Sequence, residues 1–283
     1  MNSGKYAMNA ETSKWIPRIL ILISFLFILL MLVTPLTVIM TEAFRAGLKS
    51  YWRAVSDPYA LKALQLTLLA ATTAVVLNTA FGLTAAWAIT RFSFKGKGLI
   101  TTLIDIPFAV SPIIAGLIFI LTFGRLSWLH PFLSAHDLKV VFAAPGIVIV
   151  TLFVTFPFVA REIIPVLEAR GTDEEQAAAL MGAGLFAIFR RITFPHIRWA
   201  LLYSVILCAA RAIGEFGAVS VVSGHLRGKT NTLPLHVEIL YNEYQFNAAF
   251  AVSSLLAFAA IGILTARNIV EFTAKKEEEG HVR

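Results

Sequence analysis

Two oppositely charged residues lie four positions apart inside an otherwise apolar stretch of this sequence. Arg211 and Glu215 occur in the segment AARAIGEFGA, residues 209–218. Residues at i and i+4 are neighbours on an α-helix, so the two side chains are expected to pair. Arg211, together with Ser111 or backbone donors, could instead offer positive potential to a passing anion. Because Glu215 largely cancels that field, the sequence favours an ion pair that fixes helix packing or gates two states.

Glycine and proline residues surround these charges and the other candidate pathway segment. Gly214 and Gly217 thin the helix beside the charged pair and are expected to let another helix approach closely. The segment DIPFAVSPIIAG, residues 105–116, contains Pro107 and Pro112, which each remove a backbone donor. We expect this segment to be bent and to face the interior of a helix bundle; a bend that only improves packing is the alternative.

A polar passage between two apolar runs combines charges, two glycines, a proline and a cluster of apolar side chains. The passage EEQAAALMGAGLFAIFRRITFP, residues 174–195, is called the elbow below. Its pattern predicts a helix from Glu174, a break at Gly182 and Gly184, and a second short helix that Pro195 ends before the next apolar run. An exposed apolar patch rimmed by charges indicates an interaction site, although the elbow could instead fold back onto the membrane surface. The predicted patch consists of Leu185, Phe186, Ile188 and Phe189.

The composition places these segments in an integral membrane protein. The chain is 58% hydrophobic and 14% charged, with a mean hydropathy of +0.76, whereas soluble domains carry roughly 25% charged residues. Six apolar runs are each long enough to cross the hydrocarbon as a helix. The first is too long for a signal-peptide core and is expected to remain as an anchor. The predicted spans are 19–40, 66–89, 99–123, 143–160, 199–222 and 249–266.

The positions of the basic residues predict the orientation of the chain. Lys and Arg concentrate in the N-terminal tail, in the loop after the second span, in the connection between the fourth and fifth spans, and in the C-terminal tail. By the positive-inside rule both termini and the elbow face the cytoplasm. The net charge of +7 is thereby explained by topology, so no nucleic-acid partner is expected. The expected organisation is a cytoplasmic tail (1–18), a first membrane helix (19–41), a membrane core (60–270) that includes the loop 164–198, and a second cytoplasmic tail (271–283).

Catalytic chemistry is not indicated by any pattern in the chain. The six histidines are scattered, no metal-ligand or Ser/His/Asp spacing occurs, and the one cysteine, Cys208, lies inside an apolar span. The triplet Gly228-Lys229-Thr230 resembles the end of a phosphate-binding loop, but Ser223 stands where that loop needs its first glycine. We therefore expect no bound cofactor and no catalytic residues, with any ATP hydrolysis performed by another subunit.

The elbow resembles the EAA motif of ATP-binding-cassette (ABC) importer permeases, which reads Glu-Ala-Ala, three residues, Gly, nine residues, then Ile-x-Leu-Pro. Two positions depart from this pattern, namely Gln176 at the Glu and Phe194 at the Leu. The resemblance implies that the elbow is a coupling helix that docks on a cytoplasmic ATPase. Gln176 could then offer only a neutral hydrogen bond, and Glu175, about 100° away round the helix, is an imperfect substitute. The matched residues are Gln176, Ala177, Ala178, Gly182, Ile192 and Pro195.

Other segments narrow the resemblance to one group of these permeases. Residues 209–218 are similar to the fifth-helix signature of sulfate, molybdate and thiamine permeases. Residues 105–119 and 228–246 resemble the CysW-type permease family of bacterial sulfate/thiosulfate importers. This resemblance implies an all-α, six-span type I ABC importer permease in the bacterial inner membrane.

The same resemblance implies a set of partners. These are a homologous CysT-type permease, two cytoplasmic ABC ATPase subunits, and a periplasmic or lipid-anchored sulfate-binding protein. The outer loop 230–246 is the candidate surface for docking that binding protein, or it caps the bundle. Alternatives are the same machine for molybdate or another oxyanion, and an ion-coupled carrier. The sequence disfavours the carrier because residues 18–140 and 141–270 show no repeat.

Overall fold

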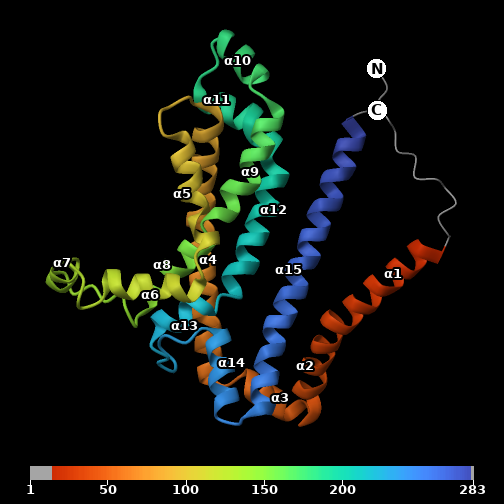
Figure 1. The fold of residues 1–283 in the computed structure, drawn as a ribbon, viewed down its shortest axis with the longest axis vertical. Helices are drawn as coiled ribbons and strands as arrows, with labels where there is room; N and C mark the ends of the chain where they lie inside the picture. Colours follow the sequence, from red (N-terminus) through yellow and green to blue (C-terminus); the bar gives the residue numbers. More distant parts are fainter. Residues whose placement is uncertain (1–14, 282–283) are drawn as a thin grey trace.

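The computed structural model describes residues 15–281, which fold as helices joined by loops (Figure 1). Two π-helical turns interrupt this order, Leu29–Val33 between α1 and α2 and Phe189–Thr193 between α11 and α12. In chain order the helices are α1 (Trp15–Ile28), α2 (Thr34–Arg45), α3 (Leu48–Val55), α4 (Pro58–Arg91), α5 (Lys97–Ala109), α6 (Pro112–Phe123), α7 (His130–Ala135), α8 (Ala144–Thr155), α9 (Pro157–Arg170), α10 (Asp173–Leu180), α11 (Leu185–Ile188), α12 (Phe194–Ile213), α13 (Gly217–Ser223), α14 (Leu233–Asn242) and α15 (Phe246–His281).

Within residues 15–281, five helical stretches are long and apolar enough to cross a membrane. The number of candidate spans is six if the bent pair α5 and α6 is counted as one span. This confirms the prediction of an all-α protein with several spans. The predicted third span is not one helix, because the chain bends by 108° between α5 and α6. The five continuous stretches are Trp15–Arg45, Pro58–Arg91, Ala144–Arg170, Leu185–Ile213 and Phe246–Ala274.

The predicted fifth span, 199–222, is wrong as one helix, because α12 ends at Ile213 and α13 begins at Gly217. Other helices are longer than the apolar runs that predicted them. Helix α4 has 34 residues, which is about 51 Å at 1.5 Å per residue, whereas the hydrocarbon is about 30 Å thick. It begins at a capped turn in which the Asp57 carboxylate accepts from the backbone N–H groups of Tyr59 and Ala60. The stretch that corresponds to the fourth predicted span, 143–160, likewise continues to Arg170. Hydropathy marks the lipid-facing part of a helix, so the polar ends escaped the sequence analysis.

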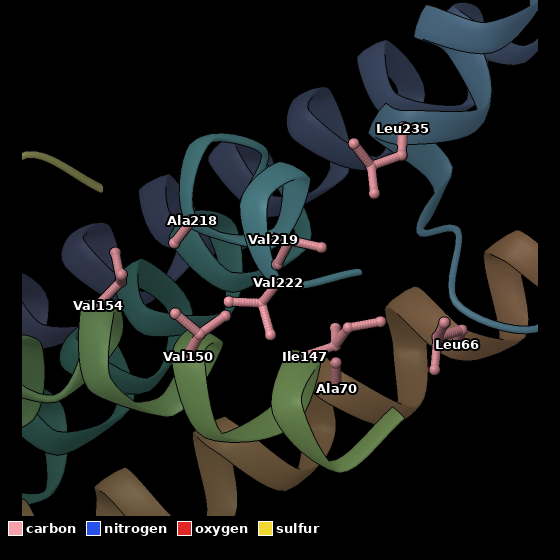
Figure 2. Packing of buried hydrophobic residues seen from close by; sticks show 9 residues of the cluster. All are labelled: Leu66, Ala70, Ile147, Val150, Val154, Ala218, Val219, Val222 and Leu235. Carbon is pink, nitrogen blue, oxygen red and sulfur yellow. The ribbon is translucent and has the colours of Figure 1, made fainter. Parts of the chain in front are cut away.

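Buried aliphatic side chains from four helices form one core of the bundle (Figure 2). Helix α4 contributes a leucine and an alanine, α8 an isoleucine and two valines, α13 an alanine and two valines, and α14 a leucine. Small and branched side chains at these contacts let the four helix backbones lie close together. The residues are Leu66, Ala70, Ile147, Val150, Val154, Ala218, Val219, Val222 and Leu235.

The ends of the molecule separate the elbow from the outer loop. Figure 1 shows α10 and α11 at one end of the long axis, with the last turns of α15 toward the same end. Helices α3 and α14 lie at the other end. Helix α1 stands apart from the bundle, and none of its residues is buried. The elbow and the C-terminal part of α15 thus share one end, as the charge distribution requires.

A buried asparagine compensates for the break between α8 and α9. At this break the N–H of Phe156 bonds to the carbonyl of Phe153, three residues back, so the carbonyl of Leu152 loses its usual donor. The side-chain Nδ2 of Asn78 in α4 donates to that carbonyl at 3.1 Å and to Thr155 Oγ1 at 2.8 Å. Asn78 is fully buried. It therefore satisfies groups that hydrocarbon could not.

We predict that Asn78→Leu lowers the midpoint of thermal unfolding of the purified protein in detergent. The substitution keeps the number and branching of the side-chain heavy atoms but strands the carbonyl of Leu152, at a cost of about 1–3 kcal/mol. Thr79→Val is the matched control, because its hydroxyl bonds only to Val75 within α4. Equal unfolding midpoints for Asn78→Leu and the control would show that Asn78 does not stabilise the break between α8 and α9.

Candidate functional site

The first half of the elbow is a two-turn helix that ends at a glycine. Helix α10 has three acidic residues in its first turn, where the positive end of the helix dipole favours negative charge. Beyond its end, the N–H of Gly182 bonds to the carbonyl of Ala179 and the N–H of Ala183 bonds to that of Ala178. This pair of bonds is the Schellman motif, which satisfies the last carbonyls of a helix.

Gly182 has a φ of +85°, in the left-handed region that side chains with a Cβ disfavour. A Cβ at this position would meet no atom within 4 Å. Glycine is therefore required at this position by the backbone conformation and not by a lack of space for a side chain. The predicted break at Gly182 is confirmed, and Gly184 precedes the first residue of α11.

Beside this turn, apolar side chains project into solvent. Leu180, Met181 and Phe186 are 90%, 82% and 74% exposed, and Leu185 is exposed as well. We call these four residues the elbow patch. Scattered single apolar residues need no explanation, but four around one turn form a contiguous candidate for docking.

The elbow patch contains Leu180 and Met181 in place of the predicted Ile188 and Phe189. Ile188 is buried and Phe189 is half-buried, with the Phe189 ring 5.5 Å from that of Trp87 in α4. Neither side chain extends the exposed surface, and the Phe189 ring contact joins the elbow to α4. Residues three and four after Leu185 share its helical face, so local periodicity predicts one common environment for all three, and tertiary packing separates them.

Pro195 does not end a helix, contrary to the prediction. It lies in the first turn of α12, directly after the π-helical turn Phe189–Thr193, and the helix continues into the membrane span. A proline ring inside a regular α-helix clashes with the carbonyl of the preceding turn. The wider π-helical turn, in which the N–H of Phe194 bonds to the carbonyl of Phe189, accommodates that ring.

The remaining motif residues divide between the surface and the interior. Gln176 and Ala177 are exposed, Ala178 is buried and Ile192 is half-buried. The Gln176 amide donates to Thr172 Oγ1 at 2.7 Å within its own helix. Gln176 and Ala177 therefore face outward beside the elbow patch.

Glu175 faces the bundle, and the sequence analysis missed its partner. Its carboxylate lies 2.7 Å from Arg91 Nε, and both side chains are largely buried. It was considered only as a stand-in for Gln176 on the partner-facing side. Its neighbours in the sequence give no signal of a residue so distant along the chain.

The charged pair of the fifth span forms the predicted contact. Arg211 Nη1 lies 2.5 Å from Glu215 Oε2, and Glu215 is only 2% exposed. The other carboxylate oxygen accepts the backbone N–H of Ala218 at 2.8 Å, which caps the start of α13. A carboxylate engaged on both oxygens favours the interpretation that this pair fixes the helix break.

Two helix breaks lie against each other at this level. Helix α12 ends at Gly214, and α13 begins at Gly217. A Cβ on Gly217 would lie 3.1 Å from the Pro112 side chain at the start of α6, so the glycine permits this close approach. Ser111 precedes Pro112, is exposed, and makes no capping bond to α6. The predicted pathway residues are thus gathered around the facing ends of α6 and α13.

The outer loop both caps the bundle and exposes an aromatic end. Its residues 230–233, 235, 236 and 240 are buried, and the N–H of Leu233 donates to Thr67 Oγ1 of α4 at 2.7 Å. Burial lowers the pKa of His236, the Arg227 charge acts in the same direction, and Asp57 and Glu243 oppose both. Tyr241 and Tyr244 remain exposed. Within residues 15–281 no group of three His, Cys, Asp or Glu side chains could hold a metal ion.

We predict that Arg211→Ala destabilises the protein more than Glu215→Gln does. The first change strands a buried carboxylate, for which breaking a buried pair costs about 3–5 kcal/mol. In the second, the amide oxygen can still accept from Ala218, and the stranded arginine is partly exposed. Thermal unfolding in detergent measures the order, and the double variant is expected to recover most of the loss. Wild-type stability of Arg211→Ala with selectively lost anion transport would favour a pathway role.

Comparison with known proteins gives this arrangement a family. Residues 78–272 match the family described as binding-protein-dependent transport system inner membrane component. The chain is 44% identical to the sulfate transport system permease protein CysW of Synechococcus elongatus, over 96% of this chain and 95% of that protein. It is 34% identical to the sulfate transport system permease protein CysT of Salmonella typhimurium, over 91% and 93%.

A solved structure shares the fold. It is the bacterial alginate ABC transporter in complex with an alginate pentasaccharide-bound periplasmic protein. The TM-score is 0.76 at 14% sequence identity, and the match covers 93% of this chain and 94% of that one. The helical arrangement is therefore that of an ABC importer permease. The match over residues 78–272 and the 44% identity to CysW show that this chain belongs to the family of binding-protein-dependent transport system inner-membrane components.

Proposed function

We propose that this chain is the permease subunit of an ATP-driven importer of sulfate or thiosulfate, and that it forms half of the translocation pathway. The observation that supports it most is the elbow patch, presented on a helix that the Gly182 turn ends abruptly. Leu180, Met181 and Phe186 leave a large apolar area in water at one end of the molecule. Burying that area against a second protein is favourable by about 25 cal/mol per Å².

The partner at the elbow patch is a cytoplasmic ATPase subunit, one of two in the complex. The EAA-like spacing in this loop supports it, as does the excess of basic residues at the same predicted face of the membrane. In this account nucleotide binding moves the ATPase, and the ATPase moves the elbow. In this account the ATPase binds and hydrolyses the nucleotide, and this chain is its non-catalytic partner.

The substrate is assigned from the relatives, and the membrane site is consistent with that assignment. Both of these relatives are sulfate transport permeases by name. In this chain the Arg211 charge is neutralised by Glu215, so the two facing helix breaks offer an anion little net attraction. A separate sulfate-binding protein therefore supplies most of the selectivity, and docks on the outer loop where Tyr241 and Tyr244 are exposed.

A second, homologous permease of the CysT type completes the pathway. The chain has 34% identity to a protein of that name, which fits a pair that arose from one fold. Both termini and the elbow face the cytoplasm, and the outer loop faces the periplasm or cell exterior. The complex resides in the bacterial inner membrane.

Reconstitution in vesicles tests the proposal. The chain is inserted with its cognate second permease and ATPase, the binding protein and ATP are supplied on opposite faces, and uptake of labelled sulfate is measured. Uptake that requires both ATP and the ATPase is expected. Accumulation of sulfate by vesicles that contain this chain alone would contradict it, and uptake of molybdate in preference to sulfate would change the substrate.

We predict that Gly182→Glu abolishes uptake and loosens association with the ATPase while membrane insertion stays intact. The substitution forces a left-handed residue with a Cβ, at about 1–2 kcal/mol, and places a charge beside the elbow patch. Co-purification of the ATPase and vesicle uptake are the measurements. Gly98→Glu is the matched control, since Gly98 has an ordinary φ and open space around it, outside the elbow. Normal co-purification and transport in Gly182→Glu would remove the elbow from the coupling path.

A further inference from the structure

One carboxylate of the elbow is engaged by two different parts of the bundle. Glu175 Oε2 lies 2.7 Å from Arg91 Nε, with side chains 14% and 9% exposed. Its Oε1 accepts from the hydroxyl of Thr193 at 2.7 Å. Both oxygens contact groups of this chain, so Glu175 is directed into the molecule.

The two partners of Glu175 connect it, directly or through one further bond, to three membrane helices. Arg91 is the last residue of α4, and its Nη1 donates to the carbonyl of Leu167 in α9 at 3.1 Å. Thr193 is the last residue of the π-helical turn that leads into α12, and it is buried. We call this set of contacts among Glu175, Arg91, Thr193 and the Leu167 carbonyl the Glu175 junction. Through it α10 is tied to the ends of α4, α9 and α12.

Without the Glu175 junction, α10 would have a pivot at each end. Gly171 precedes the helix with a φ of +69° and Gly182 follows it with a φ of +85°, and neither has an atom within 4 Å of where a Cβ would stand. Flexible joints of this kind absorb movement. A force on α10 reaches the membrane helices as a rigid displacement only if another contact stops the helix from swinging.

The polar neighbours of Glu175 show that burial is specific to this residue. The Glu174 side chain is largely exposed, and its Oε2 lies 3.5 Å from His196 Nε2. Gln176 is exposed, and its amide donates a hydrogen bond to Thr172 in the same helix. Burying an ion pair is costly, and well-packed apolar side chains of similar volume are often at least as stable. Stability alone therefore does not explain why Arg91 and Glu175 form a buried ion pair. A need to hold α10 in one fixed geometry against the bundle does explain it.

We propose that Glu175 is the positioning residue that transmits movement of the elbow to the membrane helices, through its contacts with Arg91 and Thr193. The inference rests on the proposed function, in which an ATPase moves the elbow. The elbow patch makes the external contact, and Glu175 makes the internal one. Loss of Glu175 should then separate ATP hydrolysis from transport, while loss of the elbow patch should remove the ATPase itself.

The test is Glu175→Gln in the complete complex with both permeases, the ATPase and the binding protein. Labelled sulfate uptake and phosphate release are measured in the same vesicles. Hydrolysis and ATPase association are expected to persist, while sulfate taken up per ATP hydrolysed falls about tenfold, within the ~5–150-fold range typical of coupling between sites. Glu174→Gln is the matched control and should keep the wild-type ratio.

A double-variant cycle identifies the pair. Arg91→Gln should lower the ratio of uptake to hydrolysis as Glu175→Gln does, and the double variant should be no worse than either single one. Glu175→Asp should restore part of the ratio. If Glu175→Gln does not accumulate, Thr193→Val serves instead, because it removes one contact of the carboxylate and keeps the ion pair; a smaller fall is expected.

Two results would overturn the inference. One is a wild-type ratio of uptake to hydrolysis in Glu175→Gln, or in Thr193→Val where that variant replaces it. The other is loss of ATPase association in Glu175→Gln, which would make Glu175 part of the docking surface. Failure of the wild-type complex to take up sulfate with ATP would instead contradict the proposed function.

Discussion

Helix interruptions in this chain depend on polar groups of the chain itself, because hydrocarbon offers no donor or acceptor to a freed backbone group. Asn78 supplies a donor to the carbonyl of Leu152 where α8 gives way to α9. Glu215 accepts the N–H of Ala218 where α12 gives way to α13. These interactions determine where a membrane helix can bend, and the bundle is assembled around the bends.

Helix α12 connects the elbow with the facing ends of α6 and α13. This helix of 20 residues, about 30 Å long, begins at the π-helical turn that contacts Glu175 and ends at the break that Glu215 caps. Pro112, at the start of α6, lies against the far side of that break. A displacement at the elbow therefore has one continuous helix along which to reach the two facing breaks. The elbow and the two facing helix breaks are connected by one helix and not by a series of contacting side chains.

Local patterns in the sequence predicted several of these features. Apolar run length indicated the spans, the spacing of Arg211 and Glu215 indicated their pairing, and the residues around Pro112 indicated a bend. The turn at Gly182 followed from the conformational freedom of glycine. Each of these depends on residues within a few positions of one another, where helix geometry alone fixes the neighbours.

Features that depend on distant residues escaped prediction. Hydropathy cannot tell whether Ile188 is exposed or buried, because an apolar side chain suits both a docking surface and an interior contact. The partners of Asn78 and Glu175 come from other helices, so only the packed structure reveals them. Pro195 was read as a helix end because the compensating π-helical turn has no signature in composition. Tertiary packing decided each of these cases.

Photocrosslinking from the elbow patch in native membranes tests the central claim most directly. A photoreactive amino acid replaces Phe186, which is exposed beside the Gly182 turn and makes no ring contact with the bundle that would hold it inward. The account predicts an adduct with a separate ATPase subunit, and an adduct yield that changes when a non-hydrolysable ATP analogue is added. Adducts with lipid alone, in cells that import sulfate through this chain, would contradict it.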